Sequence, residues 1–123
     1  MMIEVSNGEV LDKLSIIEIK NDRGLNVDRE LKILSDNSKI LLEKSVIVRF
    51  FRILKAINTE LWEIEDMKRD FERTRNFEEE FKEYSRAVYM LNDERAKIKK
   101  YIDNLTGSEI SEQKSHEAYD KIR

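Results

Sequence analysis

Residues 45–74 read SVIVRFFRILKAINTELWEIEDMKRDFERT, and residues 76–105 read NFEEEFKEYSRAVYMLNDERAKIKKYIDNL. In both stretches, apolar residues recur in alternating steps of three and four, which is the spacing of one face of an α-helix. The first row is Phe50, Leu54, Ile57, Leu61, Ile64, Lys68 and Phe71. The second row is Phe77, Phe81, Tyr84, Val88, Leu91, Arg95, Ile98, Ile102 and Leu105. The two stretches therefore predict two long amphipathic helices.

The segment between these two helices is short, so they are expected to be antiparallel neighbours. If Phe71 lies beside Phe77, then Ile64 faces Tyr84 and Leu54 faces Arg95. This register predicts which polar side chains of the two helices can meet.

Two shorter helices are predicted before residue 45. The string Ser6-Asn7-Gly8-Glu9 is a capping box, which begins a first helix that runs to about Asp22 and is ended by Gly24. A second helix begins near Asn26 or Asp28, and the poor helix formers at 35–38 predict a kink or break there.

Further signals mark the ends of the long helices. Ser45 is the expected cap of the third helix, and Asn76-Phe77-Glu78-Glu79 is a second capping box for the fourth. Gly107 ends the fourth helix, and residues 108–123 are predicted to form a short docking helix. The fold predicted for residues 1–123 is one all-α domain: an antiparallel bundle of four main helices plus a short C-terminal helix.

The composition excludes several classes of protein. The 123 residues contain no cysteine and no proline, which rules out a disulfide scaffold, a cysteine zinc site and a cysteine nucleophile. No apolar run approaches the roughly 20 residues that cross a membrane, so we expect a cytoplasmic protein without a membrane partner. Acids and bases interleave to a net charge of −3, which argues against nucleic-acid binding. No cofactor is predicted.

The acidic residues around Trp62 suggest a metal site, which the predicted register argues against. Glu60 and Glu63 share a helix face, as do the acidic pairs that hold Mg²⁺ in all-helical nucleotide pyrophosphatases. In the predicted register, however, Glu63 lies near Arg86, and Asp93 is roughly 12 Å farther along. We therefore expect a Glu63–Arg86 salt bridge and no bound metal.

Arg95 interrupts an apolar row, and a guanidinium there needs a partner. The candidates are Glu18 on the first helix, Asn58 on the third, or a bound anion. The favoured interpretation is a half-buried Arg–Glu pair that fixes the order of the helices. The alternatives are a ligand carboxylate or phosphate, and a helix partner at a dimer seam. Helical chorismate mutases bind a dicarboxylate with a set similar to Glu18, Lys20, Arg95 and Lys99, but their arginine-rich first helix is missing here.

Four strings, at residues 9–20, 61–66, 86–89 and 92–96, resemble an uncharacterised family of short helical proteins from bacteria and marine phages. The resemblance covers nearly the whole chain and implies a single all-helical domain without an assigned activity. Its polar positions are candidate ligand-binding residues: Glu18, Lys20, Glu63, Asp66, Arg86, Asn92, Asp93 and Arg95. The lack of proline and the many Lys, Asn and Ile residues suit an AT-rich genome, which points to a phage.

The leading functional hypothesis is a non-enzymatic accessory protein that binds another protein or itself as a dimer. Two helices of about 28 residues, each roughly 42 Å long, have more apolar surface than a chain of this length can cover. The alternative is a small ligand- or Mg-nucleotide-binding bundle whose pocket contains Glu18, Glu63, Asp93 and Arg95. The first hypothesis predicts an exposed apolar patch and a paired Arg95. The second predicts a pocket in which charged groups from several helices converge unpaired.

Overall fold

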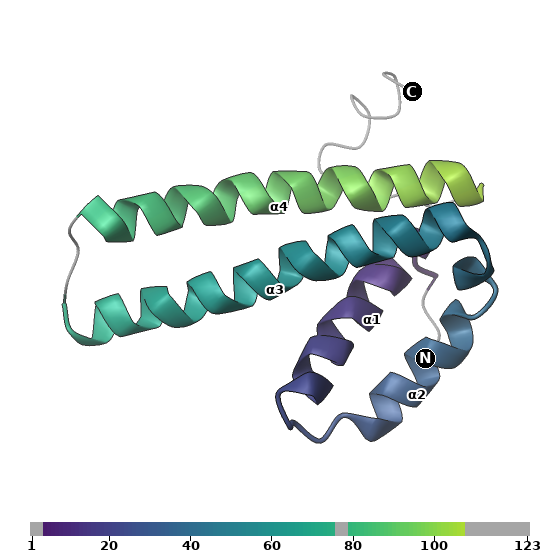
Figure 1. Cartoon of the computed structure of the whole chain (residues 1–123), viewed down its shortest axis with the longest axis horizontal. Coiled ribbons are helices and arrows are strands. Elements are labelled where there is room, and N and C mark those ends of the chain that lie inside the picture. Colours follow the sequence, from purple (N-terminus) through teal and green to yellow (C-terminus); the bar gives the residue numbers. More distant parts are fainter. Residues whose placement is uncertain (1–3, 76–78, 108–123) are drawn as a thin grey trace.

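The computed structural model describes residues 4–75 and 79–107, which form helices and no strands (Figure 1). The elements are α1 (Asn7–Asp22), α2 (Asp28–Ser38), the short 3₁₀ helix η1 (Leu41–Glu43), α3 (Ser45–Arg73) and α4 (Glu79–Thr106). The predicted all-α fold with four main helices is therefore confirmed. The predicted C-terminal helix lies outside the described residues, as does most of the second capping box.

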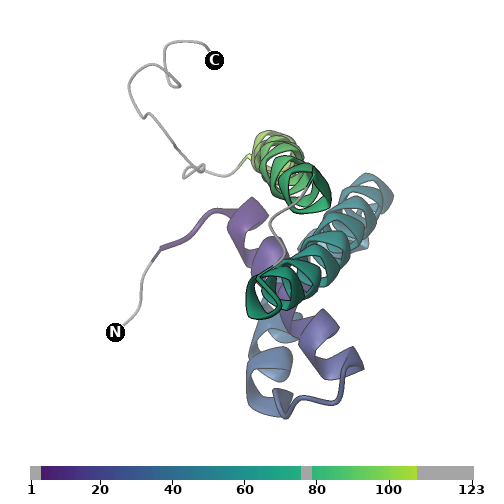
Figure 2. The ribbon, with the colours of Figure 1, turned by 90° about the vertical axis from the view of Figure 1, so that its left-hand side faces the viewer.

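Helices α3 and α4 form a long antiparallel hairpin (Figure 1). Helix α1 crosses this hairpin near one end and contacts both of its helices, while α2 packs mainly on α1. Seen along the hairpin, α1 and α2 lie on one side of it, and no described helix covers the other side (Figure 2). The hairpin is thus supported on one face and over part of its length.

The core lies where α1 enters the groove between α3 and α4. Its buried apolar residues are Leu11, Leu14, Ile47, Phe51, Leu54, Ile98 and Ile102. The predicted row on α3 is half right, because Phe50 and Ile57 are only partly buried while Ile47 and Phe51 belong to the buried core. The reason is that α3 packs against α1 as well as α4, so its buried surface is wider than one row.

The register of the hairpin differs from the predicted one. Tyr84 was expected to face Ile64, but its ring stacks on Phe71 with centroids 5.7 Å apart, two helical turns farther along α3. At the other end, the rings of Phe50 and Tyr101 are 5.8 Å apart, one turn from the predicted pairing. Phe81 also contacts Phe71, with ring centroids 6.3 Å apart and one turn from its predicted position, so α4 is displaced by about one turn toward the C-terminal end of α3.

The ends of α1 follow the sequence signals closely. The Ser6 hydroxyl accepts a hydrogen bond from the Glu9 N–H at 3.1 Å, which is the first half of the predicted capping box. The Glu9 carboxylate instead lies near Lys99 of α4. At the other end, Gly24 has a φ of +83°, a left-handed conformation that glycine adopts without steric cost.

Two predicted boundaries in the middle of the chain are shifted. Helix α2 continues through residues 35–37 and ends at Ser38, so the break falls at the last residue of the predicted segment. Ser45 is the first residue of α3 rather than its cap, because Lys44 occupies the cap position and no side chain caps this end.

Replacing Ser6 by alanine is expected to lower the free energy of unfolding by about 1 kcal/mol, since the Glu9 N–H loses its acceptor. Thermal unfolding followed by circular dichroism measures this loss. Ser45→Ala is the matched control, and it should change stability by less than about 0.5 kcal/mol because Ser45 caps nothing. Equal effects at the two serines would contradict the assigned cap.

Candidate functional site

The N-terminus of α1 abuts the last turns of α4. The Gly8 N–H donates to Asp103 Oδ1 at 2.7 Å, and Asn7 Nδ2 donates to Thr106 Oγ1 at 2.9 Å. Asp103 is buried. Because it accepts a hydrogen bond from the first turn of α1, its carboxylate sits at the positive end of the α1 dipole. The approach requires glycine, because a Cβ on Gly8 would lie 2.3 Å from the Lys99 carbonyl oxygen. This contact places the next turn of α1 directly beside α4.

Asp12 is the centre of the polar contacts between the helices, and only 1% of its surface is exposed. Arg95 donates to both of its carboxylate oxygens, from Nε at 2.9 Å and from a terminal nitrogen at 2.5 Å. The Asn58 amide also donates to Asp12 Oδ1, at 2.9 Å, and to the Ser15 hydroxyl at 2.7 Å. A forked arginine–carboxylate contact is directional, so Asp12 fixes α1 relative to both α3 and α4.

A second basic residue joins this contact from α4. Lys99 Nζ lies 2.6 Å from Glu9 Oε2 and 3.8 Å from Asp12 Oδ2, and its side chain is buried. Two acids from α1 therefore meet two bases from α4, and their formal charges cancel. We call Glu9, Asp12, Arg95 and Lys99 the charged cluster.

The structure confirms that Arg95 forms a half-buried ion pair, but the predicted partner residue is wrong. Arg95 forms a half-buried pair with an acid of the first helix, but the acid is Asp12 rather than Glu18. The two acids are six positions apart and point about 120° away from each other on the helix. Asn58, the other candidate, is present beside Arg95 and binds the same carboxylate. The overlooked signal is that Asp12 lies between Gly8 and Ser15, small residues that let another helix approach.

A groove of about 340 Å³ opens beside the charged cluster, between α1, α3 and α4. It is lined by Ile16, Ile19, Asn58, Leu61, Trp62, Glu65, Arg69 and Arg95. The Arg95 side chain is 28% exposed. The Arg23 guanidinium lies 5.4 Å from the centre of the Trp62 ring, a cation–π contact. The groove thus combines apolar walls with arginine nitrogens.

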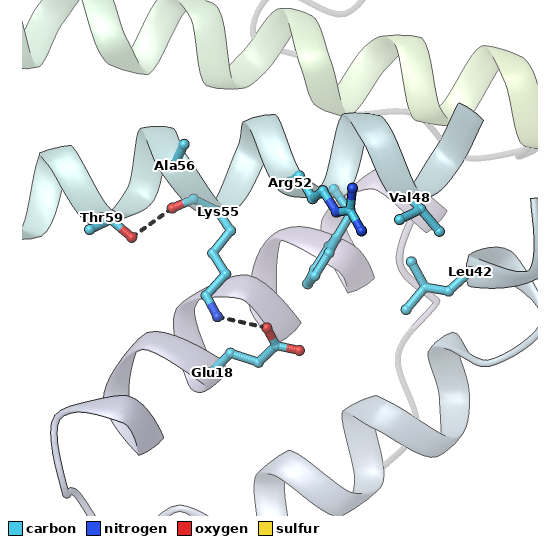
Figure 3. A pocket seen from close by; sticks show the side chains of 8 residues that line it. Glu18, Leu42, Val48, Arg52, Lys55, Ala56 and Thr59 are labelled. Atoms are coloured by element: carbon cyan, nitrogen blue, oxygen red, sulfur yellow. Dashed lines mark hydrogen bonds and ion pairs between the residues drawn. The ribbon is translucent and has the colours of Figure 1, made fainter. Parts of the chain in front are cut away.

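A second pocket, of about 580 Å³, lies between α1, η1 and α3 (Figure 3). Its lining residues are Glu18, Leu42, Val48, Phe51, Arg52, Lys55, Ala56 and Thr59. Lys55 reaches across to Glu18 at 3.0 Å and to Asp22 at 3.2 Å. Partial burial opposes the charge of Lys55, but the hydrogen bonds to both carboxylates outweigh it and raise the pKa of its ammonium group.

The raised pKa of Lys55 predicts a pH-dependent contribution to stability. The folded chain holds this proton more tightly than the unfolded one, so the stabilisation is present below the ordinary pKa of 10.5 and is lost as the pH rises through the folded value. At pH 9 we expect Glu18→Gln to be less stable than the wild type by up to about 1 kcal/mol. Urea unfolding measured up to about pH 11.5 should show this difference shrinking. Glu60→Gln, at an exposed position, is the control that should show no such trend.

The other predicted site residues do not converge. Glu63 lies 3.6 Å from Arg23, whereas Arg86 pairs with Glu83 on its own helix, so the predicted Glu63–Arg86 bridge is wrong. Glu83 and Arg86 are three positions apart on one helix, so their side chains are always within reach of each other. The shifted register also moves Arg86 away from Glu63, its predicted partner on α3.

The remaining four candidates have separate environments. Asp66 is exposed and pairs with Arg69, and Asp93 is exposed on α4. Lys20 is half-buried on α1. Asn92 is the one that joins Arg95, whose third nitrogen lies 3.4 Å from the Asn92 amide oxygen. Of the eight predicted residues, the structure therefore brings together Asn92 and Arg95.

Residues 4–75 and 79–107 lack two features, a cluster of metal ligands and a membrane-spanning helix. In this part of the chain, no three His, Cys, Asp or Glu side chains are grouped as a metal site would require. None of its helices combines the length and the apolar character needed to span a bilayer.

Comparison with known proteins places the chain in a family. The model of a family of unknown function, DUF6165, matches residues 1–121, so the chain belongs to this family. The resemblance to an uncharacterised family is thereby confirmed. No curated protein and no solved structure shows significant similarity to the chain.

Proposed function

We propose that this DUF6165 chain is a non-enzymatic interaction protein that binds another protein, or a second copy of itself, through one face of the α3–α4 hairpin. Six large apolar side chains, each 43–60% exposed, carry this proposal. We call them the open face: Val46, Ile53 and Met67 of α3, and Met90, Tyr101 and Leu105 of α4. A gathering of large exposed apolar side chains is typical of protein-binding surfaces.

Helix geometry supports one common orientation for this face. Asn58 and Lys99 mark the sides of α3 and α4 that contact α1. At 3.6 residues per turn, Ile53 points about 140° away from Asn58, and Tyr101 about 160° away from Lys99. The contact between Phe50 and Tyr101 joins the two rows at the hairpin seam. The open face is therefore turned away from α1, on the side that Figure 2 shows without a covering helix.

The charged cluster favours a structural role over a catalytic one. Its two acids and two bases balance, and Arg95 is engaged by Asp12 through two hydrogen bonds. A buried group that serves as an acid or base in catalysis must instead be available to a substrate. The cluster therefore supports the hairpin as a rigid platform for binding.

We infer a cytoplasmic role for this protein, in a phage-infected cell. The chain lacks cysteine, which suits a reducing compartment, and its composition suits an AT-rich phage genome.

Site-specific photo-cross-linking tests the proposal. A benzophenone amino acid replaces Tyr101 in one variant and Leu25 in the other, two positions with the same exposure of 48%. Illumination in an extract of the cells that make the protein should give a cross-linked protein product at Tyr101 and none at Leu25. Absence of any product at Tyr101, at micromolar concentration of the folded variant, would contradict the proposed function.

The groove beside the charged cluster favours a second candidate function, the binding of a small anion with an apolar body. The guanidinium groups of Arg69 and Arg95 line this groove next to the ring of Trp62. Trp62 is the single tryptophan of the chain, so its fluorescence reports directly on this groove. A panel of nucleotides with Mg²⁺ and of dicarboxylates should be titrated with wild type and with Arg69→Ala. Quenching with a raised melting temperature, weakened in the variant, would favour this candidate.

A further inference from the structure

We propose that the occupant of the open face is a second copy of the chain, related by a two-fold axis that passes beside Ala56. The inference rests on the proposed function, since it requires that the open face bind protein. In this arrangement the α3 helices of the two copies run antiparallel, and the hairpins pack on each other by the faces that α1 leaves uncovered.

The charges along the exposed side of α3 are arranged so that they would pair with those of a second, antiparallel copy of the same helix. Arg52 and Glu60 lie four positions before and after Ala56, and Arg49 and Glu63 lie seven positions before and after it. All four side chains are exposed. A two-fold axis at Ala56 therefore places each arginine of one copy opposite a glutamate of the other. Such pairs set the orientation of antiparallel helices.

Two apolar residues of the open face follow nearly the same symmetry. Val46 lies ten positions before Ala56 and Met67 eleven positions after it, and each is 43% exposed. Val46 of one copy therefore lies beside Met67 of the other, and this pair buries apolar surface at each end of the contact. At the centre, Ala56 faces its own copy, and its small side chain lets the two helices approach closely.

Three of these four charged residues have no ion pair within the described part of one copy, whereas Glu63 lies 3.6 Å from Arg23 at an exposed position and would exchange this contact for the partner's arginine. Among residues 4–75 and 79–107, none forms an ion pair with Arg49, Arg52 or Glu60, although the chain is 40% charged. Lys55 reaches down to Glu18, whereas the Ala56 side chain, at the edge of the same pocket, points away from α1 (Figure 3). An unrelated partner would give no reason for opposite charges at equal distances from one alanine.

Cysteine cross-linking tests the axis directly, because the chain has no cysteine of its own. Ala56→Cys introduces one thiol beside its symmetry mate, and Asp93→Cys introduces one on the exposed surface of α4. Under mild oxidation, Ala56→Cys should form a disulfide-linked dimer, which requires Cα atoms within about 7 Å. Asp93→Cys should remain monomeric. Light scattering of the wild type should give twice 14.7 kDa.

Charge reversal tests the pairing. Arg49→Glu with Arg52→Glu should weaken dimerisation at least about tenfold, since four acids then face one another across each contact. Adding Glu60→Arg and Glu63→Arg to the same chain reverses both sides and should restore the dimer. Circular dichroism checks that each variant keeps its helices, which these exposed positions allow.

The outcomes separate the inference from the proposed function. A wild-type chain that stays monomeric up to about 100 µM, a range in which weak dimers already form, would overturn the second copy as occupant, as would a failure of the reversed charges to restore pairing. If Tyr101 nevertheless cross-links to a different protein, the proposed function stands and this inference alone fails. If Tyr101 yields no product at all, both fail.

Discussion

Replacing Asp12 by alanine is expected to lower the free energy of unfolding by about 4 kcal/mol, the largest loss we expect from removing a single charge among residues 4–75 and 79–107. The substitution removes the acceptor of both Arg95 hydrogen bonds and of one Asn58 hydrogen bond. Lys99 keeps Glu9, but Arg95 remains half-buried without its carboxylate. A charge stranded in this way is more costly than the pair itself is stabilising, so the loss exceeds that of an ordinary ion pair.

Urea unfolding followed by circular dichroism measures this loss. Asp66→Ala is the matched control, because it removes an aspartate that pairs with an arginine on the exposed surface of α3. It should cost less than about 0.5 kcal/mol. In a double-mutant cycle, Arg95→Met should recover part of the loss caused by Asp12→Ala, since it removes the stranded charge. A loss below about 1 kcal/mol for Asp12→Ala would contradict the central place given to this residue.

Gly8→Ala is expected to lower the free energy of unfolding by about 3 kcal/mol. The added methyl group would lie 2.3 Å from the Lys99 carbonyl oxygen and 2.9 Å from its carbon. Both are backbone atoms of α4, so neither can swing aside as the end of a side chain would. Helix α1 must move away instead, which stretches the hydrogen bond from the Gly8 N–H to Asp103.

The sign of this effect is the decisive observation. In a helix that touches nothing, replacing glycine by alanine stabilises by about 1 kcal/mol. Thermal unfolding of Gly8→Ala therefore distinguishes a tight contact from an open one, because a tight contact lowers the melting temperature and an open one raises it. Gly24→Ala is the control: nothing lies within 4 Å of the added carbon there, and only the left-handed backbone opposes it. A stabilised Gly8→Ala variant would show that α1 does not lie against α4.

Periodicity and capping predicted the helices because both are local. The row of apolar residues on α3 and the Ser6 cap need no knowledge of the rest of the chain. The register of α4 against α3 is not local. A heptad row looks the same after a shift of seven positions, so Tyr84 fits Ile64 and Phe71 equally well in the sequence. Only the packing of rings and of α1 selects one alignment.

The candidate site was predicted in part for the same reason. Arg95 was identified because a charged side chain on an apolar row needs an oppositely charged partner, and Asp12 is that partner. The identity of the partner depended on the rotation and depth of α1, which no periodic pattern specifies. Exposed residues such as Arg86 carry little information, because a long charged side chain pairs with whichever neighbour is nearest, here Glu83.

The contact between the start of α1 and the end of α4 also constrains the order in which the chain can fold during its synthesis. The carboxylate that binds the Gly8 N–H belongs to a residue 95 positions later, and the guanidinium that binds Asp12 to one 83 positions later. A nascent chain that ends before α4 has neither group, so its first helix lacks both of these contacts until α4 has been synthesised. Translation therefore has to pass residue 103 before the earliest part of the protein can complete its native contacts.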